Sequence, residues 1–144
     1  VFLDRRSIGQ ICMETVNQFT ARHSYDGFLK QLGGTAAHKD DILANGYGYG
    51  GWVRNFRKLV EKIKVNETVI APKLEKKITA SYRGVVKNTT KVLAGESIRG
   101  GKFKTLSEMK TALRKERGRV KEALGYLEKG GQDFNNELDR IWGN

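Results

Sequence analysis

Cysteine and proline are almost absent from this chain: one of each occurs in 144 residues. A single cysteine, Cys12, cannot form an internal disulfide, which excludes the class of small secreted domains held together by bridges. One proline argues against proline-rich linkers and tails. No apolar run approaches the roughly 18 residues of a membrane span. The first ten residues lack the charged-then-apolar order of a secretory signal, so we expect no secretion by that route.

The length and the apolar content fit one folded domain. Domains commonly contain about 100 to 150 residues, and 38% of this chain is hydrophobic, which is enough for a core. We expect a single helical domain over residues 1–144. Within it, residues 1–51 form N-terminal helices and a glycine-aromatic connector, and residues 52–144 form a basic helical bundle.

Positive charge is concentrated in the middle of the sequence. The chain carries 27 Lys and Arg against 16 Asp and Glu, a net charge of +11. Residues 1–53 hold five bases and five acids, residues 54–121 hold 20 bases and six acids, and residues 122–144 hold two bases and five acids. Such an excess repels itself in a compact fold unless a polyanion or counterions offset it. Nucleic acid is therefore the first expected partner, and an anionic membrane surface the second.

Apolar residues recur at spacings of three and four, which is typical of amphipathic helices, and no alternating run long enough for a sheet is present. The sequence predicts an all-α fold of about five helices packed as a small bundle, with an N-terminal arm that contains Arg5 and Arg6. Pro72 is expected in the first turn of its helix. Thr105 and Glu108 form a capping box ahead of a long helix. The expected segments are 8–19, a separate piece at 25–32, a short helix at 36–43, and helices at 52–64, 72–93, 105–127 and 133–142, the last capped by Asp133.

Several motifs have a plain structural interpretation. The letters G-x-G-x-x-G at 46–51 match a dinucleotide fingerprint, but no strand precedes them, so a flexible connector or a partner contact through Tyr47 and Tyr49 is favoured. Cys12 lies on an apolar helix face and is interpreted as a core residue. His38 with its neighbouring aspartates matches no usual metal-ligand spacing. We therefore expect a binding protein without catalytic residues, metal or cofactor.

Three successive basic helix faces indicate a polyanion-binding surface. One charged face is ordinarily just solvated. The faces of the expected helices at 52–64, 72–93 and 105–127, however, all have few compensating acids. No RNA-binding aromatic pattern, GXXG loop or zinc-finger spacing is present, so contacts are expected with phosphates, which fix position without reading sequence. A third face, over 110–121, is also basic. The predicted nucleic-acid-binding residues are Arg5, Arg6, Arg54, Arg57, Lys58, Lys62, Lys64, Lys73, Lys76, Lys77, Arg83, Lys87, Lys91, Arg99, Lys102 and Lys104.

A small, basic, helical chain with an arginine-bearing arm (Arg5, Arg6), the connector GYGYGG and a bundle behind it resembles the major coat proteins of filamentous archaeal viruses. The resemblance covers most of the chain in size, charge and helix layout. It implies that subunits, alone or with a related second subunit, wrap double-stranded DNA in A-form inside a helical filament. It also implies a virion location and a DNA-binding role for the basic residues of 52–64 and 72–93. The charge-neutral first 53 residues depart from that pattern.

Two other functions remain open from the sequence. A small basic nuclease or toxin domain acting on RNA would need a general base and an electrostatic stabiliser, for which the candidates are His23 or His38 beside Arg54, Arg57 or Lys58. A helical adaptor would instead use the basic faces to bind an acidic protein or a lipid surface. The first expectation remains a structural protein, in a virion or inside a cell, that coats double-stranded DNA without sequence preference.

Overall fold

Helices are the only regular secondary structure in the parts of the chain that the structure describes. The computed structural model describes residues 7–32, 50–78 and 81–143. The all-α class is confirmed, with six helices in these ranges rather than about five. The short helix expected at 36–43 and the arm with Arg5 and Arg6 lie outside the described residues. The helices are α1 (Ile8–Leu32), α3 (Gly50–Lys62), α4 (Glu67–Lys76), α5 (Tyr82–Ile98), α6 (Leu106–Leu124) and α7 (Gly131–Trp142).

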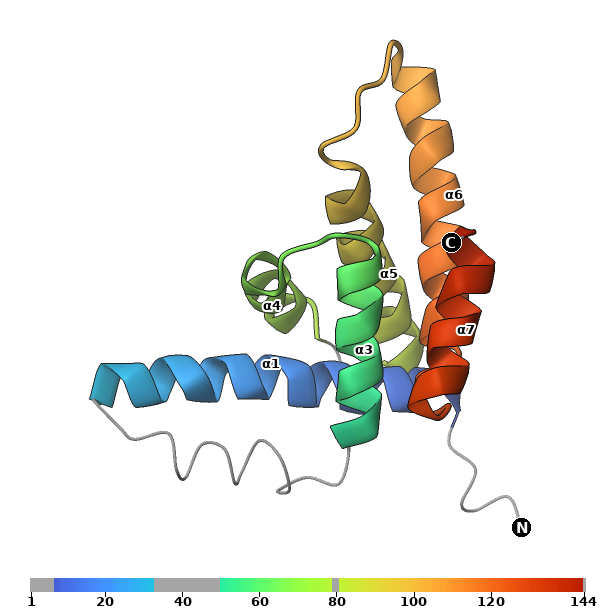
Figure 1. The fold of residues 1–144 in the computed structure, drawn as a ribbon. Coiled ribbons are helices and arrows are strands. Elements are labelled where there is room, and N and C mark those ends of the chain that lie inside the picture. Colours follow the sequence, from blue (N-terminus) through green and yellow to red (C-terminus); the bar gives the residue numbers. More distant parts are fainter. Residues whose placement is uncertain (1–6, 33–49, 79–80, 144) are drawn as a thin grey trace.

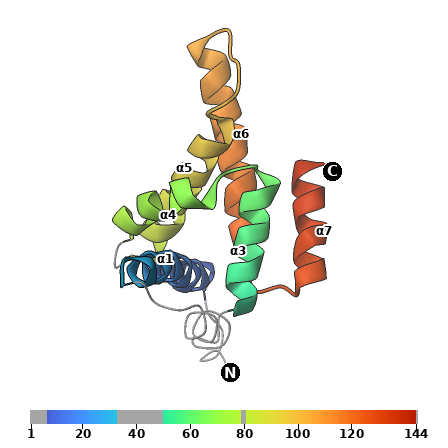
Figure 2. The same cartoon turned by 60° about the vertical axis from the view of Figure 1, so that its left-hand side comes forward.

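The long helix α1 lies across the base of the molecule, and α3, α5, α6 and α7 run at a steep angle to it (Figure 1). α1 packs against α3, α4 and α5, and α7 packs against α3 and α6. α5 and α6 form an antiparallel hairpin, and the first turns of α6 project beyond the other helices in both views (Figures 1 and 2). None of the described helices combines the length and apolar character needed to cross a bilayer.

The core is made by one apolar face from each helix. Phe19 of α1 and Phe56 of α3 are fully buried, with ring centroids 4.9 Å apart in a tilted arrangement. Aromatic pairs in this arrangement stabilise the fold beyond the contribution of the apolar area that they bury. The other large, fully buried side chains include Leu59, Ile70, Leu74, Leu93, Leu124, Leu127 and Phe134.

The close approach of α1 to α5 depends on a glycine. A Cβ at Gly9 would lie 2.7 Å from the Cβ of Tyr82, well inside van der Waals contact. Any larger residue would force the two helices apart. Gly9 therefore fixes the start of α1 against the start of α5.

The single helix expected over 72–93 is wrong, because two helices occupy this region. α4 begins earlier, where Asn66 Oδ1 accepts a hydrogen bond from the Thr68 N–H (2.9 Å) and caps the helix. Pro72 lies inside α4 rather than in its first turn. α5 is a separate helix that begins after Ser81, whose Oγ accepts from the Gly84 N–H (3.1 Å). Two capping side chains thus outweigh the continuous apolar pattern.

Three other predicted helix boundaries can be compared with the structure. The capping box is confirmed: Thr105 Oγ1 accepts from the Glu108 N–H (3.1 Å), and the Glu108 carboxylate accepts from the Lys104 N–H (2.9 Å). The separate piece at 25–32 is wrong, since α1 continues without a break to Leu32. Asp133 is not the cap of the last helix, because α7 begins at Gly131 with Gly130 as its N-cap.

Candidate nucleic-acid interface

The predicted binding cations of the described residues divide into three groups, and the first group is used within the protein. These side chains form ion pairs, three with acids of a neighbouring helix and one, Arg99 with Glu96, at the end of the same helix. The hydrogen bond from Lys73, followed by the charges of Lys73 and Arg99, keeps the pKa of Glu96 below its ordinary value. Their charge is therefore partly neutralised before any ligand arrives. The pairs are Arg57 with Glu67 (2.8 Å), Lys62 with Asp139 (3.1 Å), Lys73 with Glu96, and Arg99 with Glu96 (3.5 Å).

Most other predicted cations are spread over several surfaces. Lys58 Nζ donates to the Gly131 carbonyl (3.4 Å) and so joins α3 to α7. Lys102 and Lys104 lie in the connection between α5 and α6, at the projecting end of the hairpin (Figure 1). These residues do not form one surface. The exposed members of this set are Arg54, Lys64, Lys76, Lys77, Lys102 and Lys104.

The third group of predicted cations lies, together with two cations of α6 that were not predicted, in a groove of about 940 Å³. α5 and α6 form its walls, and Ser7 and Gly9, at the start of α1, line it as well. No Asp, Glu or His of the described ranges lines it. We call this hollow the basic groove. Its cations are Arg83, Lys87 and Lys91 from α5, and Arg117 and Lys121 from α6.

Helical spacing explains why these cations share a face. Residues four apart lie one turn apart on the same side of a helix. Arg83, Lys87 and Lys91 follow that spacing on α5, and Arg117 and Lys121 follow it on α6. Lys110 and Arg114 continue the basic character of α6 toward the projecting end.

None of the five groove cations forms a hydrogen bond or an ion pair with another described residue. Like charges that face each other across a groove raise the local potential and attract counterions. The start of α1 adds to this potential, because the first N–H groups of a helix carry partial positive charge. The groove is thus the described surface where cationic charge is both clustered and uncompensated.

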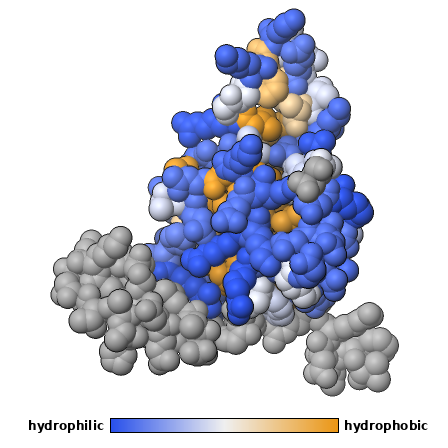
Figure 3. All heavy atoms as spheres, in the orientation of Figure 1, coloured by the Kyte–Doolittle hydropathy of each residue, from blue (hydrophilic) through white to orange (hydrophobic). Residues whose placement is uncertain are grey.

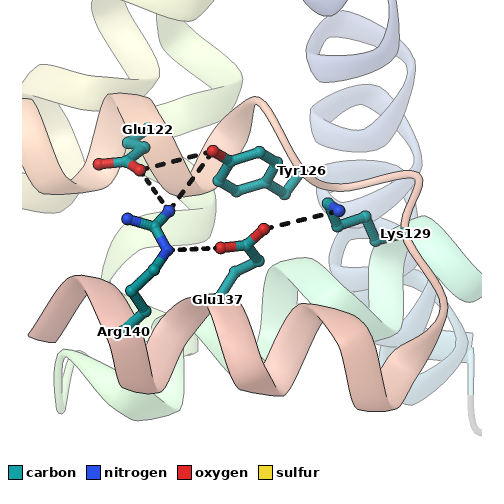
Figure 4. Close-up of polar contacts among 5 residues, drawn as sticks. All are labelled: Glu122, Tyr126, Lys129, Glu137 and Arg140. Carbon is teal, nitrogen blue, oxygen red and sulfur yellow. Dashed lines mark hydrogen bonds and ion pairs between the residues drawn. The ribbon is translucent and has the colours of Figure 1, made fainter. Parts of the chain in front are cut away.

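The acids of α6 and α7 do not neutralise the groove, because they are held by cations on another side of α6. Arg140 of α7 binds Glu122 of α6 (2.5 Å) and Glu137 (2.7 Å), and Lys129 also approaches Glu137 (3.5 Å). Figure 4 shows Glu122 and Tyr126 pointing toward Arg140. The hydrogen bond from Arg140 lowers the pKa of Glu137. Glu122 and Glu137 are therefore paired with Arg140 and Lys129 rather than with the groove cations.

The sequence predicted Arg83, Lys87 and Lys91 on one helix face, and the structure places them together along the groove. It did not assign Arg117 and Lys121 to the predicted binding residues. The signal for these two was their spacing of four on the face of α6 away from Glu116 and Glu122. Only the pairing of α5 with α6 shows that the two rows face one groove. Arg5 and Arg6 lie outside the described residues.

The structure gives no catalytic or metal-binding setting to the cysteine and histidine side chains that it describes. Cys12 is fully buried, as predicted, and burial raises the pKa of its thiol to about 12. The His23 ring lies 4.8 Å from that of the buried Phe19. His38 and most of the 46–51 motif lie outside the described residues. Within the described ranges, no group of three or more His, Cys, Asp or Glu residues is placed to hold a metal.

Comparisons with protein families, with curated proteins and with solved structures found no match for this chain.

Proposed function

We propose that this protein is a structural nucleic-acid-binding protein that coats double-stranded DNA without sequence preference. The observation that carries the proposal is the basic groove, where five cations from two helices meet without partners among the described residues. Lys and Arg in such a row contact phosphates, and phosphate contacts carry affinity but no base information. The excess of 20 bases over six acids across residues 54–121 also favours a polyanionic partner.

We further propose that coating occurs in an assembly, a filament of this chain alone or with a related second subunit, as in the virion of a filamentous virus. The resemblance in size, charge and helix layout supports this. The projecting end of α6 also supports it, because Leu106 is 62% exposed and Met109 36% exposed. Figure 3 shows apolar residues near this end among hydrophilic ones, and smaller apolar areas lie lower on the same face. Contacts between copies would cover such side chains.

The salt dependence of duplex binding tests the proposal. If the five groove cations each neutralise one phosphate, log K falls with log salt at a slope of roughly −4.5. Between about 50 and 200 mM salt, affinity then falls about 500-fold. Two duplexes of unrelated sequence and equal length should bind equally. A slope near zero, or a strong sequence preference, would reject the proposal.

A pair of double variants with equal net charge locates the contacts. Arg117→Gln with Lys121→Gln removes two groove cations, and the slope should fall to roughly −2.7. Lys73→Gln with Arg99→Gln removes two cations that already pair with Glu96, and the slope should stay close to that of the unmodified protein. Equal effects of the two variants would show that total charge, and not the groove, determines binding. Electron microscopy with and without duplex DNA tests the filament directly.

A further inference from the structure

The wall of the basic groove contains a hydroxyl group whose hydrogen-bonding capacity is unused. Thr90 lines the groove, is 6% exposed, and its Oγ1 has no hydrogen-bond partner among the described residues. Thr15 and Thr20 behave differently, because each hydroxyl donates to the carbonyl four residues earlier, at 2.7 and 2.9 Å. A buried hydroxyl without a partner is costly and uncommon. Thr90 therefore indicates a ligand that completes its hydrogen bonding.

A second set of donors lies at the start of α1. Ser7 Oγ accepts from the Gln10 N–H (3.1 Å), and the Ser7 carbonyl accepts from the Ile11 N–H (3.0 Å). The backbone N–H groups of Ile8 and Gly9, which precede Gln10, have no acceptor within α1. They form the positive end of the dipole of a 25-residue helix. Because Ser7 and Gly9 line the basic groove, these donors lie at one end of it. Helix starts of this kind bind phosphate groups.

The length of the groove indicates how much ligand it holds. Arg83 and Lys91 are eight residues apart on α5, which is about 12 Å at roughly 1.5 Å per residue. One strand of a duplex advances about 3.4 Å per nucleotide along its axis. Because the strand winds around that axis, its consecutive phosphates lie about twice as far apart as the axial rise, so the row on α5 spans about two to three of them, more than one isolated phosphate group would occupy.

The middle of the groove is open to the backbone of α6. Gly118 lines it, and a Cβ at this position would meet no atom within 4 Å. A ligand can therefore come closer to α6 here than it could beside a larger residue.

We infer that the basic groove holds one sugar-phosphate strand lengthwise between α5 and α6. The phosphate oxygens accept hydrogen bonds from the Thr90 hydroxyl, from the first N–H groups of α1 and from the cations of both walls. The inference rests on the proposed function for the class of ligand. It adds that the unit recognised is the backbone of a single strand, about two to three nucleotides long, and that Thr90 is a binding residue.

A negative charge placed in the basic groove tests whether the strand binds there. Gly118→Glu puts a carboxylate into open space, and Gly118→Gln puts in the same bulk without charge. Gly51→Glu is the matched control, because Gly51 also lies inside a helix with no atom within 4 Å of a Cβ, but it belongs to α3 and does not line the groove. Anisotropy of a labelled duplex of about 20 base pairs and of a labelled octathymidylate measures binding. Gly118→Glu should weaken both at least about tenfold, Gly118→Gln less, and Gly51→Glu less than about threefold.

Replacing the hydroxyl of Thr90 separates a binding role from a structural one. Thr90→Val keeps the shape of the side chain and removes Oγ1. It should weaken binding of octathymidylate about fivefold, the effect of one lost hydrogen bond. The melting temperature of the free protein should stay the same or rise, because the hydroxyl has no partner there. A lower melting temperature with unchanged affinity would overturn the role of Thr90.

The same measurements distinguish failure of this inference from failure of the proposed function. If the unmodified protein binds duplex, but Gly118→Glu binds it equally well, the strand seat is wrong and coating by another surface stands. If the unmodified protein binds octathymidylate but not duplex, and Gly118→Glu weakens that binding, then strand binding in the groove stands and duplex coating is wrong. Inorganic phosphate at millimolar concentration should compete weakly, and competition as strong as that of tetrathymidylate would overturn the strand as the recognised unit. If the unmodified protein binds neither duplex nor octathymidylate, both proposals are rejected.

Discussion

Trp142 Nε1, in the last turn of α7, donates a hydrogen bond of 3.0 Å to Oε1 of Glu116 in the middle of α6. Glu116 is 7% exposed, it also accepts from the Ser97 hydroxyl of α5, and Arg119 lies 3.6 Å from it. One carboxylate thus joins three helices. The hairpin that forms the groove is anchored to the C-terminal helix through this residue.

Removal of that acceptor should destabilise the fold. Glu116→Ala leaves the Trp142 indole and the Ser97 hydroxyl without their acceptor, and the free energy of unfolding should fall by about 2–4 kcal/mol. Glu116→Gln keeps one oxygen acceptor and should cost about half as much. Urea unfolding followed by circular dichroism measures both. Equal losses in the two variants would show that the indole bond has no weight.

Asn55 holds α3 to the turn between α6 and α7. Its Nδ2 donates to the carbonyls of Leu127 and Lys129, both at 2.8 Å, and the side chain is buried. Asn55→Ala should lower the free energy of unfolding by about 2–3 kcal/mol, since two carbonyls lose their donor. Asn136→Ala, at an exposed position, is the control and should change it by less than about 0.5 kcal/mol. A small effect at Asn55 would contradict the role given to this residue.

The two glycines that line the groove should respond to alanine in opposite directions. Gly9→Ala places a methyl group 2.7 Å from Tyr82 Cβ, so the start of α1 must shift and stability should fall by about 1–3 kcal/mol. Gly118→Ala meets open space inside α6 and should stabilise the protein by about 0.5–1 kcal/mol through helix propensity. Melting temperatures of the two variants give the test. A stabilising Gly9→Ala would show that α1 and α5 are not in this contact.

The buried thiol predicts a loss of stability at alkaline pH. The pKa of Cys12 is about 12 in the folded protein and close to 9.0 when the thiol meets solvent. Above about pH 9 the unfolded chain releases the thiol proton while the folded chain keeps it, so the unfolded state binds fewer protons and is favoured as the pH rises. The contribution is complete below about pH 9 and declines toward about pH 12, by at most about 1.4 kcal/mol per pH unit.

Cys12→Ala isolates this contribution from the titration of lysines and tyrosines. Stability against urea should fall more steeply between about pH 9 and 11 in the unmodified protein than in the variant. Parallel pH profiles would show that the Cys12 thiol is not protected by burial.

The sequence predicted the elements whose signals are local. The 52–64 helix and the start of α6 after Thr105 follow from apolar spacing and from one capping box, and both depend on neighbouring residues alone. The break between α4 and α5 was missed because the apolar pattern continues through it. Its signals were Asn66 and Ser81, whose capping role is decided by hydrogen bonds to residues two and three positions later.

The candidate site was predicted only in part. The row Arg83, Lys87 and Lys91 follows from periodicity, but the partner row on α6 depends on the angle at which two helices pack, and composition does not contain that angle. Pairing is equally non-local: Lys73 and Glu96 are 23 residues apart, and Lys62 and Asp139 are 77 apart. A count of charges therefore treats engaged and available cations alike.

The uncompensated rows on α5 and α6 make the free protein and its complex respond to salt in opposite senses. Mutual repulsion of the two rows works against closure of the hairpin, and added electrolyte screens it. Low ionic strength therefore loosens the empty hairpin, while the same condition tightens its hold on a polyanion. Under the proposed function, a bound phosphate strand would act as the missing counter-charge between the helices, and binding would then stabilise this part of the fold.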